Sequence, residues 1–392
     1  MPIQPLEGLV VLEFTHIVMG PSCGVVLADL GADVIRVEPA ADGDRTQRAR
    51  STASGSFAYF NRNKRSVCID LKTQDGLAIA RDLVRGADVL IENFGPGTMD
   101  RLGLGWDAVH ALNPRLVYLA MKGFLPGPYE HRPALDEVAQ FMTGLAYMTG
   151  PPGQPLRAGA SVVDITGGVM GVIGVLAALR QRDRDGVGQK VTSALYESAA
   201  FLVGQHMAGE AATGQPPVPI PARRGGWAIY ETFPTKNGEK LFIGITSENH
   251  WRSFCTKFER PDLYADARFV NNAQRLANRP ALRDYITAIT QAHDIETLCR
   301  MLDEGRIPFS PVRTPSDLFD DPQLNADGRM LPVRMPKGNV ANLPTTPICF
   351  GDDAPGLRLQ PPDAGAHTDD VLRARGYTED RIAALRRDGT IR

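Results

Sequence analysis

The sequence predicts an α/β fold, with an open, mostly parallel sheet in a large N-terminal domain and a smaller α+β domain after it. Short apolar runs alternate with helical patterns over the first third of the chain, which is typical of strand–helix–strand units. Residues 214–227 are rich in proline and glycine and indicate a linker. The chain has 392 residues, which is long for one core and suggests two or three domains.

The predicted strands of the large domain are short and apolar. They cover residues 9–15, 32–38, 66–72, 88–94 and 116–121, and helical patterns occupy 20–30 and 73–85, the second with Thr73 as its cap. Ligands of open parallel sheets bind beyond the carboxyl ends of the strands. We therefore expect a binding site among the loops after Thr15, Glu38, Phe94 and Lys122.

Two further helices are predicted at 136–147 and 166–182, then a strand at 189–198 and a helix at 199–212. The helix at 166–182 contains glycine at positions 167, 168, 171 and 174. Interior glycine costs a helix about 1 kcal/mol relative to alanine. This spacing therefore predicts another backbone packed closely against that face. Asp164 interrupts the apolar run, so we interpret the segment as a buried helix and expect no membrane span.

The second half of the chain starts with a predicted hairpin. Two strand patterns flank Asn237-Gly238 within residues 228–246, and Asn-Gly is a strong hairpin-turn signal. Helical patterns follow over 250–305, strands and turns return at 307–350, and 378–387 is a charged amphipathic helix.

Composition excludes several classes of function. A net charge of −2 with 22% charged residues gives no reason to expect nucleic acid or an anionic membrane as partner. The five cysteines are odd in number and far apart, and no signal-peptide pattern precedes them, so a reducing, cytoplasmic location is expected. The seven histidines form no HExxH pair, and no metal site is expected. The absence of GxGxxG, P-loop and GxSxG motifs argues against dinucleotide, P-loop and serine hydrolase chemistry.

Basic residues gather near the ends of the predicted strands and beside the glycine loop 93–97. They are Arg62, Lys64, Arg65, Lys72 and Arg101. Ordinary solvated surface usually explains such charges. Their position favours the alternative, a site for a phosphate or diphosphate.

Asp164 is the candidate for chemistry. An aspartate just before a helix is most often an N-cap. The same placement would lower its pKa and would offer N–H groups to a developing oxyanion. Carboxylates also act as covalent nucleophiles. From these residues alone, the cap is the more frequent role and the nucleophile the alternative.

Several motifs in the same order resemble the class III coenzyme A (CoA) transferases, the CaiB/BaiF family. They lie at residues 5–15, 30–38, 63–66, 70–72, 87–97, 101–103 and 365–369. The resemblance covers nearly the whole chain and places Asp164 on the catalytic aspartate of the family. It implies a CoA-transferase acting on an acyl-CoA and a small carboxylic acid, with no permanently bound cofactor.

The resemblance also implies an architecture and a mechanism. Family members are interlocked homodimers, and the resemblance implies the same assembly here. It also implies a Rossmann-like CoA-binding domain at 1–213, a small domain at 228–325 and a segment at 326–392 that returns to the large domain. Asp164 attacks the acyl-CoA to form a mixed anhydride and release CoA thiolate. The thiolate then forms an aspartyl-CoA thioester, from which CoA passes to the acceptor acid.

The remaining site residues are carried over by motif position. CoA contacts are expected at Ile69, Lys72, Asn93, Phe94 and Arg101, with Lys72 and Arg101 near phosphates. Substrate contacts are expected at His16, Val18, Leu135, Gly225 and Gly226, the two glycines belonging to a loop that closes over the aspartate in some members. Oxalate-using members have Gln where this chain has Val18, and Tyr where it has Leu135. These two differences argue against exchange of CoA between formate and oxalate.

Two other functions stay open. The first is a 2-methylacyl-CoA racemase. The related racemases have His-Asp where this chain has Leu135-Asp136, so this chain would lack one of the two bases that racemisation uses. A non-catalytic acyl-CoA-binding protein is the other alternative. A dicarboxylate such as succinate is the favoured acceptor if Arg157, Arg223 or Arg224 pairs with its second carboxylate, although solvated surface explains these arginines equally well.

Overall fold

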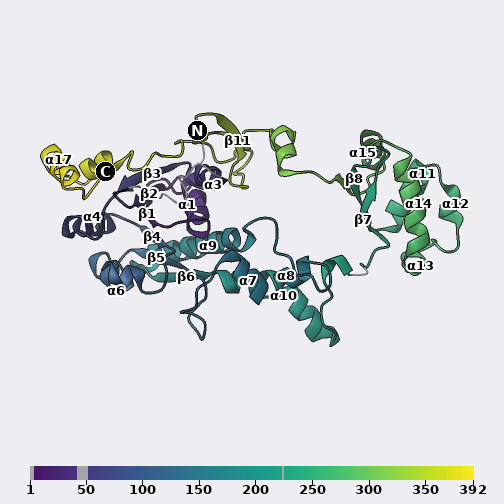
Figure 1. Cartoon of the computed structure of the whole chain (residues 1–392), viewed down its shortest axis with the longest axis horizontal. Helices are drawn as coiled ribbons and strands as arrows, with labels where there is room; N and C mark the ends of the chain where they lie inside the picture. The colour runs from purple at the N-terminus through teal and green to yellow at the C-terminus, as the bar shows by residue number, and fades with distance from the viewer. Residues whose placement is uncertain (1–3, 42–51, 223–224) are drawn as a thin grey trace. The chain divides into compact units, whose positions relative to one another are not determined.

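A computed structural model describes residues 4–41, 52–222 and 225–392 (Figure 1). The chain divides into two compact units, residues 1–222 with 321–392, and residues 223–320. The expected linker at 214–227 spans the first division. Each unit has hydrophobic clusters of its own, as expected for segments that each bury their own apolar surface.

The first unit is built on a six-stranded sheet in the order β3-β2-β1-β4-β5-β6. Every neighbouring pair in it is parallel. This order, with its reversal between β1 and β4, is that of the doubly wound Rossmann fold, and it confirms the predicted fold class. The strands are β1 (Val10–Phe14), β2 (Asp33–Glu38), β3 (Lys64–Cys68), β4 (Val89–Glu92), β5 (Val117–Lys122) and β6 (Lys190–Ala194).

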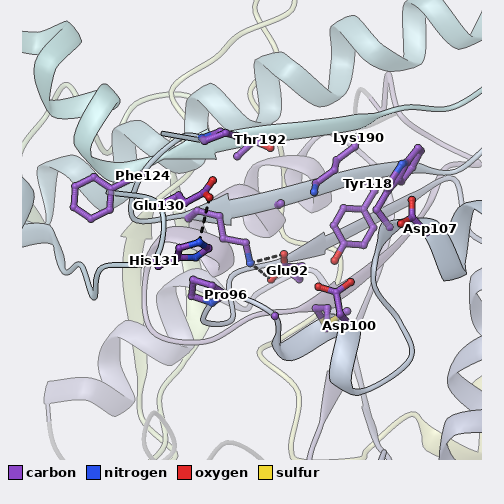
Figure 2. Close-up of a pocket in the computed structure, with 16 residues that line it drawn as sticks. Glu92, Pro96, Asp100, Asp107, Tyr118, Phe124, Glu130, His131, Lys190 and Thr192 are labelled. Atoms are coloured by element: carbon purple, nitrogen blue, oxygen red, sulfur yellow. Dashed lines mark hydrogen bonds and ion pairs between the residues drawn. The ribbon is translucent and has the colours of Figure 1, made fainter. Parts of the chain in front are cut away.

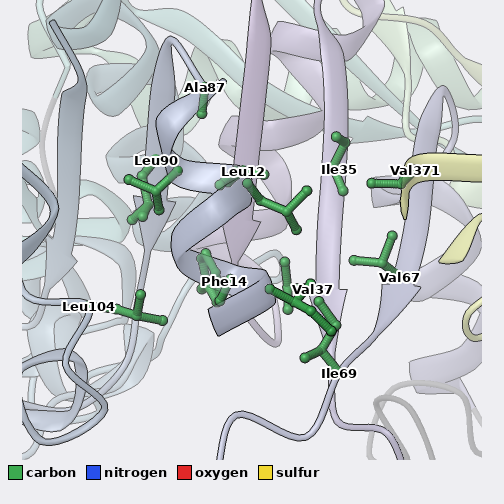
Figure 3. Close-up of a cluster of buried hydrophobic side chains, with 14 of the residues drawn as sticks. Leu12, Phe14, Ile35, Val37, Val67, Ile69, Ala87, Leu90, Leu104 and Val371 are labelled. Atoms are coloured by element: carbon green, nitrogen blue, oxygen red, sulfur yellow. The ribbon is translucent and has the colours of Figure 1, made fainter. Parts of the chain in front are cut away.

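Helices cover both faces of this sheet, and each face has its own core. Figure 3 shows one core, where Leu12, Phe14, Ile35 and Val37 of the central strands face the same side as Val371. Alternate strand residues face the other core, because successive side chains of a strand point to opposite sides. The first face is covered by α4 (Gln74–Arg85), α5 (Thr98–Arg101), α6 (Trp106–Leu112), α16 (Thr368–Ala374) and α17 (Glu379–Arg387), and the second by α1 (Met19–Asp29), α9 (Val162–Asp185) and α10 (Leu195–Thr213).

The glycines of α9 let it approach α1 closely, as predicted. A Cβ added at Gly168 would lie 2.8 Å from the carbonyl oxygen of Met19 and 2.1 Å from the hydroxyl of Ser22. At Gly174 an added Cβ would meet Val191 of β6 at 2.7 Å. Only glycine permits both approaches without a shift of the neighbouring atoms.

The opposite face of α9 carries exposed apolar side chains. Ile165, Val169, Ile173 and Leu176 are 38%, 41%, 56% and 36% exposed, and their spacing places them along one stripe of the helix. The expectation of a fully buried helix is therefore wrong for this face. By length and composition α9 is also sufficient to cross a membrane, the one such helix among the residues described, although its other face packs on the sheet.

Three predicted helix and strand boundaries differ from those in the structure. The helix predicted at 136–147 is two helices, α7 (Asp136–Met142) and α8 (Leu145–Thr149), because Gly144 takes a left-handed φ of 80°. Helix α9 begins at Val162 instead of residue 166, and α10 replaces the second half of the strand predicted at 189–198. A helix between β2 and β3, α3 (Thr52–Phe60), was not predicted.

The segment after residue 320 packs against β3 and α1. Asn63 accepts from the backbone N–H groups of Arg358 and Leu359 at 2.6 and 2.9 Å. The backbone N–H of Ser66 donates to Nδ1 of His367 at 3.1 Å, and the N–H of His367 donates back to the carbonyl of Ser66 at 2.9 Å. This segment includes the hairpin β10 (Met330–Arg334) and β11 (Val340–Pro344).

The second unit is a three-stranded antiparallel sheet with helices packed on it. The predicted Asn237-Gly238 hairpin is confirmed, with Gly238 at a φ of 86° between its two strands. Trp251, Phe254 and Phe269 are among the largest side chains of its core. Its elements are β7 (Ile229–Pro234), β8 (Lys240–Ile245), β9 (Phe309–Pro311), α11 (Glu248–Lys257), α12 (Pro261–Ala265), α13 (Asn272–Ala277), α14 (Arg279–Gln291), α15 (Ile295–Glu304) and η2 (Pro315–Asp320). The short helix η1 (Ile220–Ala222) is the last element of the first unit before the chain enters the second.

Candidate active site

A cavity of about 390 Å³ lies at the carboxyl ends of β1, β4 and β5. It is lined by the loops that follow Thr15, Glu92 and Lys122 and by the start of α9 with Asp164. Three of the four expected loops therefore meet at one site. The loop after Glu38 continues into residues 42–51, which lie outside the described residues.

Asp164 is the third residue of α9, so the prediction that it caps this helix is wrong. The N-cap position belongs to Ser161, whose side chain makes no capping hydrogen bond. Asp136 provides the cap instead: its Oδ2 accepts from the backbone N–H of Val163 at 2.8 Å and from that of Asp164 at 2.9 Å. The Asp164 carboxylate is left without a hydrogen-bond or ion-pair partner among the described residues.

Asp136 is itself tightly held. It begins α7, it is only 5% exposed, and its Oδ1 accepts from Nε2 of Gln140. The Oε1 of Gln140 accepts in turn from the backbone N–H of Ala158 at 2.8 Å. One buried chain of hydrogen bonds thus joins the start of α7, the loop before α9 and the first turn of α9.

The surroundings of Asp164 raise its pKa to about 7. Burial is the largest cause, since it disfavours the charged form, and the negative charges of Asp136 and then Glu137 add to it. The expectation that the helix N-terminus lowers this pKa is therefore wrong in direction. The expected N–H donors for an oxyanion are also occupied at Val163 and Asp164, because both bond to Asp136.

Asn93, His16 and Phe94 form one cluster at the mouth of this cavity. The Asn93 side chain accepts from the backbone N–H of His16 at 2.9 Å and donates to its carbonyl at 2.8 Å. The ring of His16 stacks on Phe94 with centroids 5.7 Å apart. The amide of Asn93 therefore fixes the loop after β1, in which Ile17 has an unusual φ of 64° for a β-branched residue.

Lys122 fastens the loop after β4 from the neighbouring strand. Its Nζ lies 2.6 Å from Oε1 and 2.8 Å from Oε2 of Glu92, and it donates to the carbonyl of Phe94 at 2.8 Å. Glu92 and Lys122 both line an adjoining cavity of about 490 Å³, and Figure 2 shows Glu92 in it with Tyr118 and Asp100 nearby. Pro96, Lys122 and Glu130 line both cavities, so the two adjoin at these side chains.

The other expected contact residues divide into three groups. Val18 and Leu135 line the cavity with Asp164. Ile69 is 2% exposed in the core and bridges Ile391 near the C-terminus, while Lys72 and Arg101 are exposed at positions outside this cavity. Gly225 and Gly226 belong to the second unit, where the carbonyl of Gly226 accepts from Asn272. Arg223 and Arg224 lie outside the described residues.

Most of the predicted basic cluster is not free to bind an anion, contrary to expectation. Arg62 is 1% exposed and pairs with Asp29 at 2.7 Å. Lys64 is fully buried and pairs with Glu13 at 2.7 Å, and Arg65 pairs with Asp33. Lys72 and Arg101 remain exposed and carry no ion pair among the described residues. In the same described part of the chain, no three metal-ligating side chains group together.

Comparisons with known proteins agree with this fold. The model of CoA-transferase family III matches residues 6–368. The chain belongs to CoA-transferase family III. A succinate–glutarate CoA-transferase of Agrobacterium fabrum is 34% identical, with 94% of this chain and 95% of the relative covered. A formyl-CoA:oxalate CoA-transferase of Rhodopseudomonas palustris is 30% identical, with 99% and 97% covered.

A solved structure shares the architecture of this CoA-transferase. A CaiB/BaiF family protein from Brucella suis matches with a TM-score of 0.86 at 31% identity, covering 96% of this chain and all of that one. The protein is thus a class III CoA-transferase, an enzyme of acyl-CoA metabolism that moves CoA between carboxylic acids. Of the site described above, Asp136, Gln140 and the Glu92–Lys122 pair were not predicted. The one signal for them was the position of Asp136 directly after Leu135.

Proposed function

We propose that Asp164 is the nucleophile of this CoA-transferase and carries CoA as an aspartyl thioester. One observation supports this most strongly. Asp164 lines a cavity at the carboxyl end of the parallel sheet, and its carboxylate has no hydrogen-bond or ion-pair partner among the described residues. A carboxylate that serves only structure would be bonded, since buried charges are normally paired.

The reaction follows from an unengaged carboxylate. A carboxylate oxygen of Asp164 attacks the acyl-CoA carbonyl, the C–S bond breaks, and CoA thiolate leaves an acyl-aspartyl anhydride. The thiolate attacks the aspartyl carbonyl, releasing the donor acid and leaving the aspartyl-CoA thioester. The acceptor carboxylate then attacks the aspartyl carbonyl of this thioester, the C–S bond breaks, and CoA thiolate leaves a second anhydride. The returning thiolate attacks its acyl carbonyl, which yields the new acyl-CoA and restores Asp164.

The function is tested by incubating the protein with succinyl-CoA or acetyl-CoA and a panel of free acids, with detection of new acyl-CoA by mass spectrometry. Transfer to at least one acid supports the proposal. A chiral 2-methylacyl-CoA in deuterated water tests the racemase alternative. Deuterium at C2 without CoA exchange would favour the racemase and rule out the transferase, and binding of acyl-CoA without either reaction would favour a non-catalytic protein.

Acyl transfer should depend on pH through Asp164. Only the ionised carboxylate attacks, so with a pKa of about 7 kcat/KM for acyl-CoA should rise tenfold per pH unit below 7 and level off above it. Replacing Asp136 by asparagine removes a negative charge and keeps one oxygen to accept from the N–H groups of α9. The rising limb should therefore move to lower pH, measured from pH–rate profiles.

Two variants serve as comparisons for Asp136→Asn. Glu137→Gln removes the smaller charge effect on Asp164 and should move the limb in the same direction by less. Asp183→Asn, on an exposed position near the far end of α9, should leave it unchanged. If Asp136→Asn left the profile at its wild-type pH, the charge of Asp136 would not control Asp164.

We also propose that the chain works as a homodimer, with the large, small and returning segments as predicted from the sequence. The uncovered stripe of α9 supports this, together with Phe201 and Met207 of α10, which are 72% and 64% exposed. Monomers rarely expose contiguous apolar surface of this kind. A molar mass by light scattering near twice 42.6 kDa is expected, and a single-chain mass at working concentration would contradict it.

The free state of Cys23, Cys68, Cys255, Cys299 and Cys349 supports a reducing, cytoplasmic location, and we propose that no cofactor is permanently bound.

A further inference from the structure

The cavity of Asp164 is lined by a basic side chain that no described residue neutralises. Arg132 lines the same cavity of about 390 Å³. Among the described residues it forms no ion pair, although four carboxylates line the same cavity. Arg132 had no sequence signal, because it follows a strand by ten residues and belongs to a loop without a periodic pattern.

The other cations near Asp164 are already engaged. Lys122 has three acceptors, both oxygens of Glu92 and the carbonyl of Phe94, which is the number of protons that its ammonium group carries. Arg157, one of the residues expected to hold a second carboxylate, pairs with Glu137 at 2.5 Å and does not line the cavity. Arg132 is therefore the guanidinium best placed to receive a negative group of the substrate.

The charges of the cavity make such a partner necessary. Asp164, Asp136, Glu137 and Glu130 all line it. Glu137 pairs with Arg157, and Glu130 lies 3.2 Å from Nε2 of His131 (Figure 2). Asp136 and Asp164 have no cation as partner in the described part of the chain. A dicarboxylic acid bound here brings a second negative charge toward these two carboxylates, and like charges at close range are unfavourable. One free guanidinium would offset that repulsion and would bind a carboxylate through two parallel hydrogen bonds.

Arg132 is held in place by its own loop. Its guanidinium lies over the ring of Tyr129 with its carbon 4.9 Å from the ring centroid. Tyr129 packs against Phe124 and Tyr196 with centroids 5.7 and 6.2 Å apart. The backbone N–H of Arg132 donates to the carbonyl of Tyr129 at 2.9 Å. An exposed arginine stacked on a fixed aromatic ring keeps its N–H edge free for a planar anion.

We propose that Arg132 binds the second carboxylate of a dicarboxylic acyl group, so that the preferred acids of this enzyme are dicarboxylates. This inference rests on the proposed function of Asp164. A cavity of about 390 Å³ is at the lower end of the range for small-molecule sites, and it accommodates the acyl end of the substrate rather than a whole CoA. A CoA phosphate offers the same anionic chemistry, and the experiment separates the two.

The test compares acceptors with one donor. With acetyl-CoA as donor, kcat/KM is measured for succinate and glutarate and for the monocarboxylates propionate and butyrate, in wild type, Arg132→Gln and Arg132→Lys. The Gln variant is expected to lose about 100-fold for the dicarboxylates and to stay within about threefold for the monocarboxylates. The Lys variant should recover part of the loss. Arg157→Gln is the matched control and should change kcat/KM for the two acceptor classes by the same factor, so that the wild-type preference is kept.

Each other outcome has a clear meaning. An equal loss for both acceptor classes, with a raised KM for acetyl-CoA, would assign Arg132 to a phosphate of CoA and would overturn the inference. An unchanged preference in Arg132→Gln would overturn it as well. A wild-type protein that transfers CoA to none of the acids would instead refute the proposed function.

Discussion

Replacing Asp164 by asparagine is expected to reduce CoA transfer by about 10⁴-fold or more, because removal of a covalent nucleophile leaves only binding and positioning. The amide is close in shape to the carboxylate but cannot form the anhydride. Asp164→Ala removes the oxygen atoms altogether and should lose as much. The measurement is the rate of new acyl-CoA formation from the wild type and both variants under saturating donor and acceptor.

The fold should survive this change. The Asp164 carboxylate caps no helix and pairs with no described residue, and the N–H of residue 164 still has Asp136 as its acceptor. Circular dichroism should therefore match the wild type, and the temperature of thermal unfolding should not fall. Asp183→Asn on the same helix should retain full activity. Wild-type transfer by either Asp164 variant would show that the nucleophile is another residue.

Replacing Glu13 by glutamine should have the largest effect on stability. Glu13 is fully buried in the central strand, where Oε1 lies 3.0 Å from Arg36 and Oε2 2.7 Å from Lys64. Burial lowers the pKa of Lys64 to about 8, and the charge of Glu13 acts against this lowering. Removing the carboxylate takes one ion-pair partner from each of two buried cations, and breaking a buried pair in this way costs about 3–5 kcal/mol.

The free energy of unfolding is measured in denaturant at one fixed protein concentration, since any assembly of chains would make it depend on concentration. The matched control is Glu304→Gln. Glu304 lies 2.9 Å from Lys257, and the two side chains are 47% and 35% exposed, so the loss should be small, because solvent screens such a pair. A loss for Glu13→Gln no greater than that of the control would mean that the buried network does not hold the sheet together.

The fold of the first unit was largely predictable because each element has its own local signal. The alternation of apolar strands with capped helices predicted β1, α1, β2 and α4, and Thr73 caps α4 as expected, accepting from the N–H of Gly76 at 2.9 Å. The glycine spacing predicted the close α1–α9 contact. The break between α7 and α8 was missed, because a left-handed Gly144 looks like any interior glycine in the sequence.

The site was predictable in composition but not in its connections. His16, Val18, Asn93, Phe94, Leu135 and Asp164 line one cavity, as the strand ends and the family motifs indicated. The bonds from Asp136 to the start of α9 span 27 and 28 residues, and no local pattern announces such a contact. Sequence spacing therefore placed Asp164 at a helix start but assigned the capping to the wrong carboxylate.

Buried ion pairs explain the other error. Arg62 and Lys64 have the same appearance in the sequence as exposed basic residues, but each has a distant carboxylate, Asp29 and Glu13, brought close by the sheet. Asn63 likewise holds a segment almost 300 residues away. Such partners depend on the register between strands and on the return of the chain, which no window of sequence contains.

The most direct test of the central claim is mass spectrometry of the enzyme incubated with acyl-CoA in the absence of an acceptor acid. The mechanism predicts a CoA adduct on the peptide that contains Asp164, which hydroxylamine converts to a hydroxamate at that residue. The adduct should be absent from Asp164→Asn and should disappear from the wild type when acceptor acid is added. An adduct on another residue would contradict the assignment of Asp164. So would an enzyme that transfers CoA without forming any adduct and keeps its activity in hydroxylamine.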